Sequence, residues 1–189
     1  MSDDDVVVAE APRRARDWNA LSALIAVLIG MLALTVSGYT AWLQRQQVRA
    51  QVWPYLEPAV SKATRDVWMV NKGVGPAIVH RVQLTVDDRP QRDWRSAFDA
   101  LGIEKLPPSS TLSGVVVAPG EKIRQLVFQD LAEYQAFMKQ YQRIALRVCY
   151  CSALGECWVM DQRQQDVTRQ REPVEVCPGP SDQDFIDNK

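Results

Sequence analysis

The stretch ALSALIAVLIGMLALTV, residues 20–36, decides how this 189-residue chain is organised. It is the centre of a longer run, Trp18 to Gln44, that contains no charged residue. An α-helix rises about 1.5 Å per residue, so this run can cross a hydrocarbon core about 30 Å thick. The sequence therefore predicts a transmembrane helix over 18–44, preceded by a short tail, 1–17, and followed by one small domain.

The apolar run is predicted to be a permanent anchor rather than a cleaved signal peptide. The apolar core of a signal peptide is only about 7–15 residues long and is followed by an Ala-x-Ala type site, which this run lacks. Trp18, Tyr39 and Trp42 lie near the two ends of the run, where aromatic rings favour the headgroup layer. We therefore expect a single-pass protein whose first partner is the lipid bilayer.

Charge and cysteine content predict the orientation of this helix. Arg13, Arg14 and Arg16 precede it, against Arg45 and Arg49 after it, and an excess of basic residues favours the cytoplasmic side. All four cysteines lie in the C-terminal portion, and bridged cysteines belong to oxidising compartments. The expected location is a bacterial inner membrane, with the N-terminus in the cytoplasm and the C-terminal domain in the periplasm.

One side of the predicted helix is lined with small residues. Their spacing of three or four places them on one helical face: Ser22, Ala26, Gly30, Ala33, Ser37 and Ala41. Small residues let two membrane helices approach closely, so the stripe predicts a packing face for a second copy or another membrane protein. The alternative is that such residues are simply common in membrane helices.

The segment after the helix predicts a mainly β domain. Residues 45–53 are good helix formers and are expected to extend the helix as a stalk, which Pro54 ends. Residues 54–178 are expected to form a β-sandwich, and 179–189 a disordered tail. The clearest strand runs from Ile78 to Val86, where every second residue, including His80, lies on the apolar face.

Further elements of the domain follow from local patterns. Strands are expected over 55–60, 66–70, 144–151 and 157–160, and over 111–117 and 122–128 as a pair joined by a tight Pro-Gly turn. Apolar spacing predicts a helix from Trp94 to Leu101 that Gly102 ends. A second helix is expected to begin at Asp130, with the buried face Leu131, Tyr134, Met138 and Tyr141.

Several short motifs carry a resemblance to known proteins. Asn-x-Gly-x-Gly-Pro-Ala at 71–77 and Ala-Pro-Gly-Glu at 118–121, around an alternating strand, resemble extracellular immunoglobulin-like modules of the CARDB and related types. With the anchor, the Trp-Pro pair at 53–54 and the Cys-Tyr-Cys-Ser…Cys-Trp hairpin at 149–158, the chain also resembles a group of uncharacterised single-pass bacterial membrane proteins over about 18–160. The resemblance implies an immunoglobulin-like sandwich with two short inserted helices beside a membrane. It implies no activity.

The cysteines are expected to form structural bridges. Cys149 and Cys151 lie two residues apart on one face of a strand, and a three-residue loop over 153–155 would bring Cys157 opposite Cys151. Residues that face each other across two strands are close enough for a disulfide. The favoured pairs are Cys151–Cys157 and Cys149–Cys177, although four cysteines allow three pairings, and the sequence leaves the choice open.

Three other uses of these cysteines compete with structural bridges. Zinc binding would need spacings that the cysteines do not have, and thiol redox chemistry at Cys149 would have only Arg147 beside it to activate the sulfur. Sortase-like acyl transfer would combine Cys149, Arg147 and His80, but Ala-Leu-Arg-Val at 145–148 lacks the sortase Thr-Leu-x-Thr pattern. The sequence therefore predicts no metal, no cofactor and no catalytic residue.

These features together predict a binding protein rather than an enzyme. Lys and Arg number 22 against 23 Asp and Glu, and this balance gives no long-range attraction for nucleic acid. We expect a membrane-anchored periplasmic binding or scaffold protein, or an accessory subunit, that acts on another membrane or periplasmic protein or on a second copy. The alternative is an envelope enzyme that uses a cysteine.

Overall fold

The computed structural model describes residues 14–164, 166 and 169–186. Arg13 and the rest of residues 1–13 of the expected tail, and 187–189 at the C-terminus, lie outside the described residues. The chain divides into two units, which meet between Gln47 and Val48.

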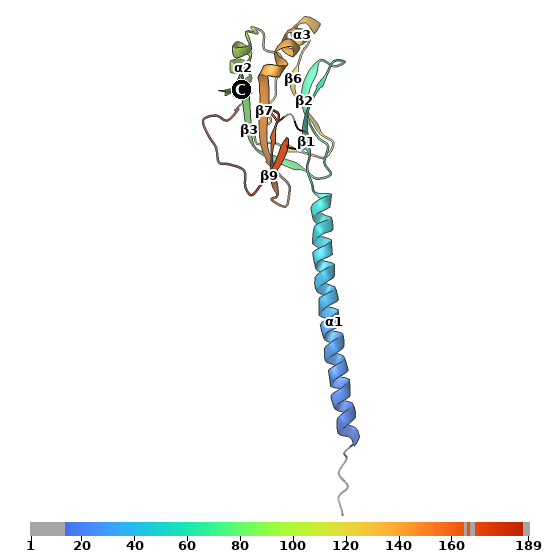
Figure 1. Ribbon diagram of the computed structural model, residues 1–189. Helices are drawn as coiled ribbons and strands as arrows, with labels where there is room; N and C mark the ends of the chain where they lie inside the picture. The colour runs from blue at the N-terminus through green and yellow to red at the C-terminus, as the bar shows by residue number, and fades with distance from the viewer. Residues whose placement is uncertain (1–13, 165, 167–168, 187–189) are drawn as a thin grey trace, which may run out of the picture. The chain divides into compact units, whose positions relative to one another are not determined.

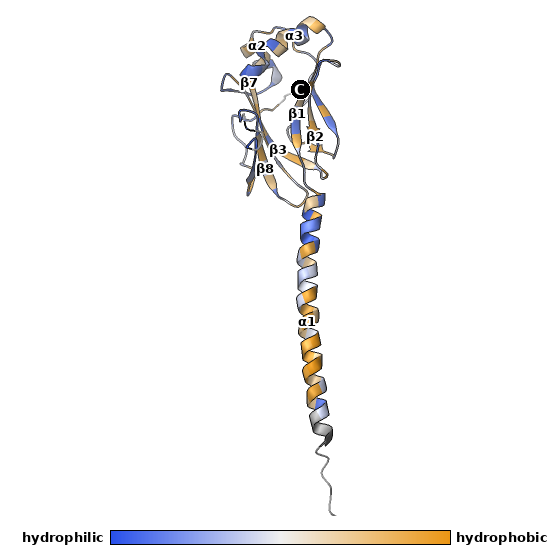
Figure 2. Ribbon diagram, turned by 45° about the vertical axis from the view of Figure 1, so that its right-hand side comes forward, coloured by the Kyte–Doolittle hydropathy of each residue, from blue (hydrophilic) through white to orange (hydrophobic). Residues whose placement is uncertain are grey.

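Helix α1, Arg14–Gln51, forms the described part of the first unit and continues into the second. It is long and apolar enough to cross a membrane, with a mean hydropathy of 2.4 in its apolar part, and Figure 2 shows this stretch. The six small residues of the predicted stripe all lie on α1 and are exposed, and a Cβ atom added at Gly30 would meet nothing outside its own helix within 4 Å. The helix ends at Gln51, three residues before Pro54, and so covers 45–51 of the stalk expected over 45–53.

The second unit contains two antiparallel sheets (Figure 1). The smaller sheet has the order β1-β2-β6, with strands β1 (Leu56–Ser61), β2 (Asp66–Asn71) and β6 (Lys122–Val127). The larger has the order β4-β3-β7-β8-β9, with β4 (Arg89–Gln91), β3 (Ala77–Val86), β7 (Ile144–Cys151), β8 (Cys157–Asp161) and β9 (Arg171–Val174). The short strand β5 (Val116–Val117) also pairs with β3. The prediction of a mainly β domain is confirmed.

One apolar core joins the two sheets to the short helices α2 (Trp94–Leu101) and α3 (Leu131–Gln140). The helices lie together over one end of the sheets (Figure 1), and a 3₁₀ turn, Tyr141–Arg143, leads from α3 into β7. Phe137 of α3 packs with its ring 5.7 Å from Phe98 of α2 and 5.1 Å from Phe128, measured between ring centroids. Because helices this short are marginal alone, this packing accounts for their stability.

A β-bulge changes the predicted faces of β3. The register of β3 against β7 shifts between Val79 and Arg81, so His80 is the additional residue and is exposed. Val79 and Val82 are buried in its place, and Arg81 lies on the outer face. The expectation that His80 shares the apolar face is therefore wrong, since one additional residue reverses the alternation on one side of the bulge.

Two expectations about residues 111–141 are also wrong. Segments 116–117 and 122–127 do not pair as a hairpin, because β5 joins β3 and β6 joins β2. In α3, Leu131 is exposed and Phe137 is buried in its place, whereas Tyr134 is buried and Met138 and Tyr141 pack partly buried against the core, as predicted. Both errors have the same cause. Tertiary packing determines which element a short strand or helix contacts, and the spacing of apolar residues along the chain contains no information about that contact.

The segment after Pro178, part of the predicted tail over 179–189, contacts the domain at Asp184 and Phe185. Phe185 is buried against Trp94, with 5.2 Å between ring centroids, and its backbone N–H donates to Val82 at 2.8 Å. The side chain of Asp184 forms an ion pair with Arg81 in which both groups are mostly buried. One aromatic side chain and one charge pair thus attach a segment whose composition is otherwise typical of disorder.

We expect Phe185→Ala to lower the free energy of unfolding by about 3 kcal/mol, because it removes a buried aromatic ring. The measurement is urea unfolding of the full-length protein in detergent, monitored by tryptophan fluorescence. Ile186→Ala is the control, since that neighbouring side chain is about half exposed and its loss should change stability much less than the loss of Phe185. Equal effects of the two substitutions would show that the C-terminal segment does not stabilise the domain.

Candidate functional site

The hairpin of β7 and β8 positions the cysteines. Cys151 and Cys157 face each other across the two strands, and their sulfurs are bonded, with 4.0 Å between the Cα atoms. Cys149 is bonded to Cys177, with 5.8 Å between the Cα atoms. The sequence favoured these two pairs, Cys151–Cys157 from the hairpin geometry and Cys149–Cys177 because those two cysteines remained. The first bridge joins β7 to β8, and the second attaches β7 to the C-terminal segment at Cys177.

The two bridges are in direct contact with each other. The sulfur of Cys151 lies 3.8 Å from that of Cys177, and the sulfurs of Cys151, Cys157 and Cys177 all lie within 4.8 Å of one another. A group of sulfurs at this separation resembles a metal site, but zinc requires thiolates, and each of these sulfurs is already bonded to another. The same bonds leave no thiolate for sortase-like transfer, and His80 lies on the exposed bulge of β3.

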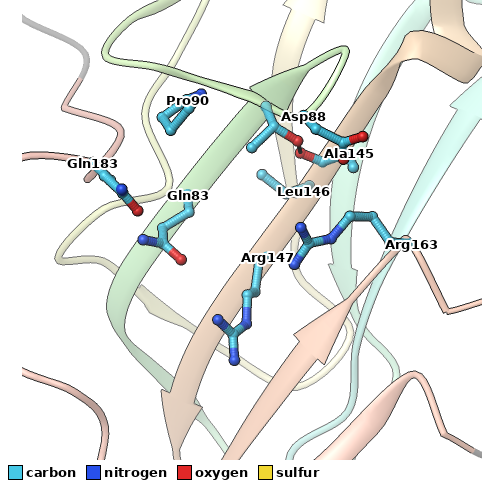
Figure 3. Close-up of a pocket in the computed structure, with 9 residues that line it drawn as sticks. Gln83, Asp88, Pro90, Ala145, Leu146, Arg147, Arg163 and Gln183 are labelled. Atoms are coloured by element: carbon cyan, nitrogen blue, oxygen red, sulfur yellow. Dashed lines mark hydrogen bonds between the residues drawn. The ribbon is translucent and has the colours of Figure 1, made fainter.

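A polar pocket of about 280 Å³ lies on the outer face of the larger sheet (Figure 3). Gln83 of β3 pairs in register with Arg147 of β7, which itself pairs with Asp161 of β8, so these three residues form one row across the sheet. Arg163 follows β8 and Gln183 belongs to the C-terminal segment, and both line the same pocket. Four separate parts of the chain thus meet around one space.

Asp161 holds Arg163 in place at the edge of this pocket. The guanidinium of Arg163 donates two hydrogen bonds to the carboxylate, from Nε to Oδ1 at 3.1 Å and from Nη2 to Oδ2 at 2.7 Å. Partial burial raises the pKa of Asp161, but the side-chain and backbone hydrogen bonds from Arg163 outweigh it and lower this pKa below its ordinary value. The carboxylate is therefore ionised at neutral pH and the pair persists.

Arg147 forms a longer ion pair with the same carboxylate than Arg163 does. Its Nε atom lies 3.8 Å from Oδ2 of Asp161, which is too far for a hydrogen bond. Within the described residues its guanidinium makes no hydrogen bond, and its side chain is 48% exposed. A guanidinium carries five N–H groups in a planar arrangement that matches carboxylate and phosphate groups. The pocket can therefore accept an acidic group at Arg147, while the carboxylate of Asp88 lines its other end.

The sequence indicates only part of this pocket. Arg147 is predicted as a neighbour of Cys149, but Gln83, Arg163 and Gln183 are missed as a group. Alternation in β3 and β7 could have placed Gln83 and Arg147 on one outer face, whereas no local signal brings Gln183 to it. No protein-family model, no curated protein and no solved structure matches this chain.

Proposed function

We propose that this chain is a membrane-anchored binding module, a scaffold or accessory subunit that does not catalyse a reaction. In this proposal α1 crosses the bacterial inner membrane with the N-terminus in the cytoplasm, and an immunoglobulin-like sandwich lies in the periplasm. The support is the fully exposed apolar stretch of α1, which requires a nonaqueous partner, together with two bridges typical of oxidising compartments.

The position of Arg147 is the main support for the proposal that the outer face of the larger sheet is the binding surface. This half-exposed cation lines the pocket, and no carboxylate lies within hydrogen-bonding distance of it in the described residues. Two other lining groups are already occupied: the hydroxyl of Thr85 is directed to the backbone oxygen of Ala145 at 3.5 Å, and Arg163 is hydrogen-bonded to Asp161. Groups held in this way favour recognition over catalysis. We infer that the partner is an acidic segment of another envelope protein.

Site-specific photo-crosslinking in intact membranes tests this surface. A benzophenone amino acid at Gln83 should give a discrete adduct, and Arg147→Glu should reduce that adduct at least tenfold, because it places like charges together. The matched control carries the benzophenone at Arg124, an exposed residue on the smaller sheet, and should not give this adduct. An adduct that Arg147→Glu leaves unchanged, or that forms equally from position 124, would contradict the proposal.

Lateral association through the small-residue stripe of α1 is the second part of the proposed mechanism. A leucine at Gly30 would fill the space that two closely packed helices need, so Gly30→Leu should weaken association several-fold. A bacterial two-hybrid assay between two copies, or between the chain and a partner found by crosslinking, measures this. Leu28→Ala is the control, since it lies off the stripe, and an unchanged signal in Gly30→Leu would exclude the stripe as the contact.

A further inference from the structure

The four cysteines form a continuous series of sulfurs that bends at Cys151, because the sulfurs of Cys157 and Cys177 lie within 4.8 Å of each other. Cys157 is bonded to Cys151, the sulfur of Cys151 lies 3.8 Å from that of Cys177, and Cys177 is bonded to Cys149. Two bonds therefore flank one short nonbonded contact. Thiol–disulfide exchange needs a thiolate in contact with a disulfide sulfur, and the sulfurs of Cys151 and Cys177 are already in contact.

We propose that this series is a thiol–disulfide exchange site whose substrate is a small-molecule thiol, since Cys157, which the thiol must reach, is only 6% exposed. An external thiolate attacks the sulfur of Cys157, forms a mixed disulfide with it and releases Cys151 as a thiolate. Cys151 then attacks Cys177, which forms a Cys151–Cys177 bond, breaks the Cys149–Cys177 bond and releases Cys149 as a thiolate. Two disulfides are present before and after, and the negative charge of the entering thiolate ends on Cys149.

The hairpin keeps Cys151 in position when its own bridge opens. Cys151 and Cys157 are the last register pair of a β7–β8 ladder, and the loop between them is closed by a hydrogen bond from the N–H of Ser152 to the oxygen of Glu156 at 2.7 Å. The strand pairing therefore remains without the disulfide. The released thiolate stays beside Cys177, which is partly exposed, instead of moving away.

Chain entropy does not oppose the second step, in which Cys151 replaces Cys149 as the partner of Cys177. The original bond between Cys149 and Cys177 spans 28 residues, and the new bond between Cys151 and Cys177 spans 26. The entropy of loop closure depends on the logarithm of loop length, so the two pairings constrain the unfolded chain almost equally. The position of the equilibrium is then decided by the surroundings of the thiolate that is released.

Those surroundings favour Cys149 as the final thiolate. Arg81 pairs in register with Cys149, and both Arg81 and Arg147 line a small cavity that includes Cys149. Arg81 forms a mostly buried ion pair with Asp184, whereas Arg147 has only a longer ion pair with Asp161, at 3.8 Å, and makes no hydrogen bond within the described residues. A nearby cation stabilises a thiolate, so Arg147 favours the state in which Cys149 is released.

Cys157→Ser in the full-length protein tests the exchange, because it releases Cys151 without an external thiol. After incubation at pH 8, free thiols are blocked with a maleimide and the bridges are mapped by peptide mass spectrometry. We expect a Cys151–Cys177 bridge in more than half of the molecules, with Cys149 as the labelled thiol. Adding Arg147→Gln should lower the ratio of labelled Cys149 to labelled Cys151 at least twofold. Retention of Cys149–Cys177 in all folded molecules would overturn the proposal.

A second pair of variants separates exchange from misfolding. Cys149→Ser with Cys157→Ser leaves only Cys151 and Cys177, and it should form their bridge fully. Its melting temperature should lie within a few degrees of that of Cys151→Ser with Cys157→Ser, which retains Cys149–Cys177. A folded first variant in which both thiols remain free would show that the two sulfurs cannot bond, and the proposal would fail.

Discussion

Replacing Asn71 with alanine will lower the free energy of unfolding by about 3–5 kcal/mol. This side chain is completely buried and makes four hydrogen bonds. Its Nδ2 group donates to the backbone oxygens of Gly75 at 2.8 Å and Val117 at 2.9 Å, and its Oδ1 atom accepts from the N–H groups of Gly73 at 2.9 Å and Tyr55 at 3.1 Å. Each buried backbone group left without a partner costs about 1–3 kcal/mol.

The glycines of the same motif explain why this asparagine matters. A Cβ atom at Gly75 would lie 2.0 Å from the backbone oxygen of Val52, and one at Gly73 would lie 2.4 Å from that of Trp53. Both contacts are with backbone, which cannot move aside as a side chain does. The motif at 71–77 therefore lets the segment that follows α1 pack against the β2–β3 turn, and Asn71 joins the two by its bond to Tyr55.

Urea unfolding of the full-length protein in detergent, followed by tryptophan fluorescence, measures the effect. Lys72→Ala is the matched control, because its side chain is exposed and forms only a surface ion pair with Glu57 at 2.9 Å. Such pairs contribute about 1 kcal/mol or less, so the control should remain near the wild type. If Asn71→Ala is no more destabilised than Lys72→Ala, the hydrogen-bond network does not determine the stability of this junction.

Features set by neighbouring residues could be predicted from the sequence. Gly102 ends α2 in the left-handed conformation, with φ of 72°, and the side chain of Asp130 caps α3 by accepting from the N–H of Ala132 at 2.6 Å. The uncharged run of α1 and the edge position of β1, which contains Pro58, follow in the same way. In each case the cause lies within a few residues of the effect.

Features that depend on contacts distant in sequence could not be predicted. The bulge at His80 shows only when β3 is placed against β7, and the burial of Phe185 depends on Trp94, which precedes it by 91 positions (185 − 94). The candidate pocket is of the same kind, since Arg147 and Gln183 belong to segments whose meeting is decided by packing. Only the hairpin pair Cys151–Cys157 had a local determinant, namely the length of its loop.

Removing the Cys149–Cys177 bridge will destabilise the domain about twice as much as removing Cys151–Cys157. In the loop-entropy account, bridges that span 28 and 6 residues contribute about 4 and about 2 kcal/mol. The structure gives the same order, because the β7–β8 ladder already holds Cys151 opposite Cys157. Cys177, in contrast, attaches the chain that continues to the buried Phe185. A total stability of about 5–15 kcal/mol makes the first loss severe.

For each bridge, both cysteines should be replaced with serine, so that no unpaired thiol is left to form a different bridge. Urea unfolding under nonreducing conditions then gives the two losses, and the variant with all four serines should match the reduced wild type and be unaffected by reductant. Because the two bridges touch at 3.8 Å, their losses are expected to be nonadditive. Equal losses for the two pairs, or a larger loss for Cys151–Cys157, would show that the constraint on the C-terminal segment is not what the longer bridge contributes.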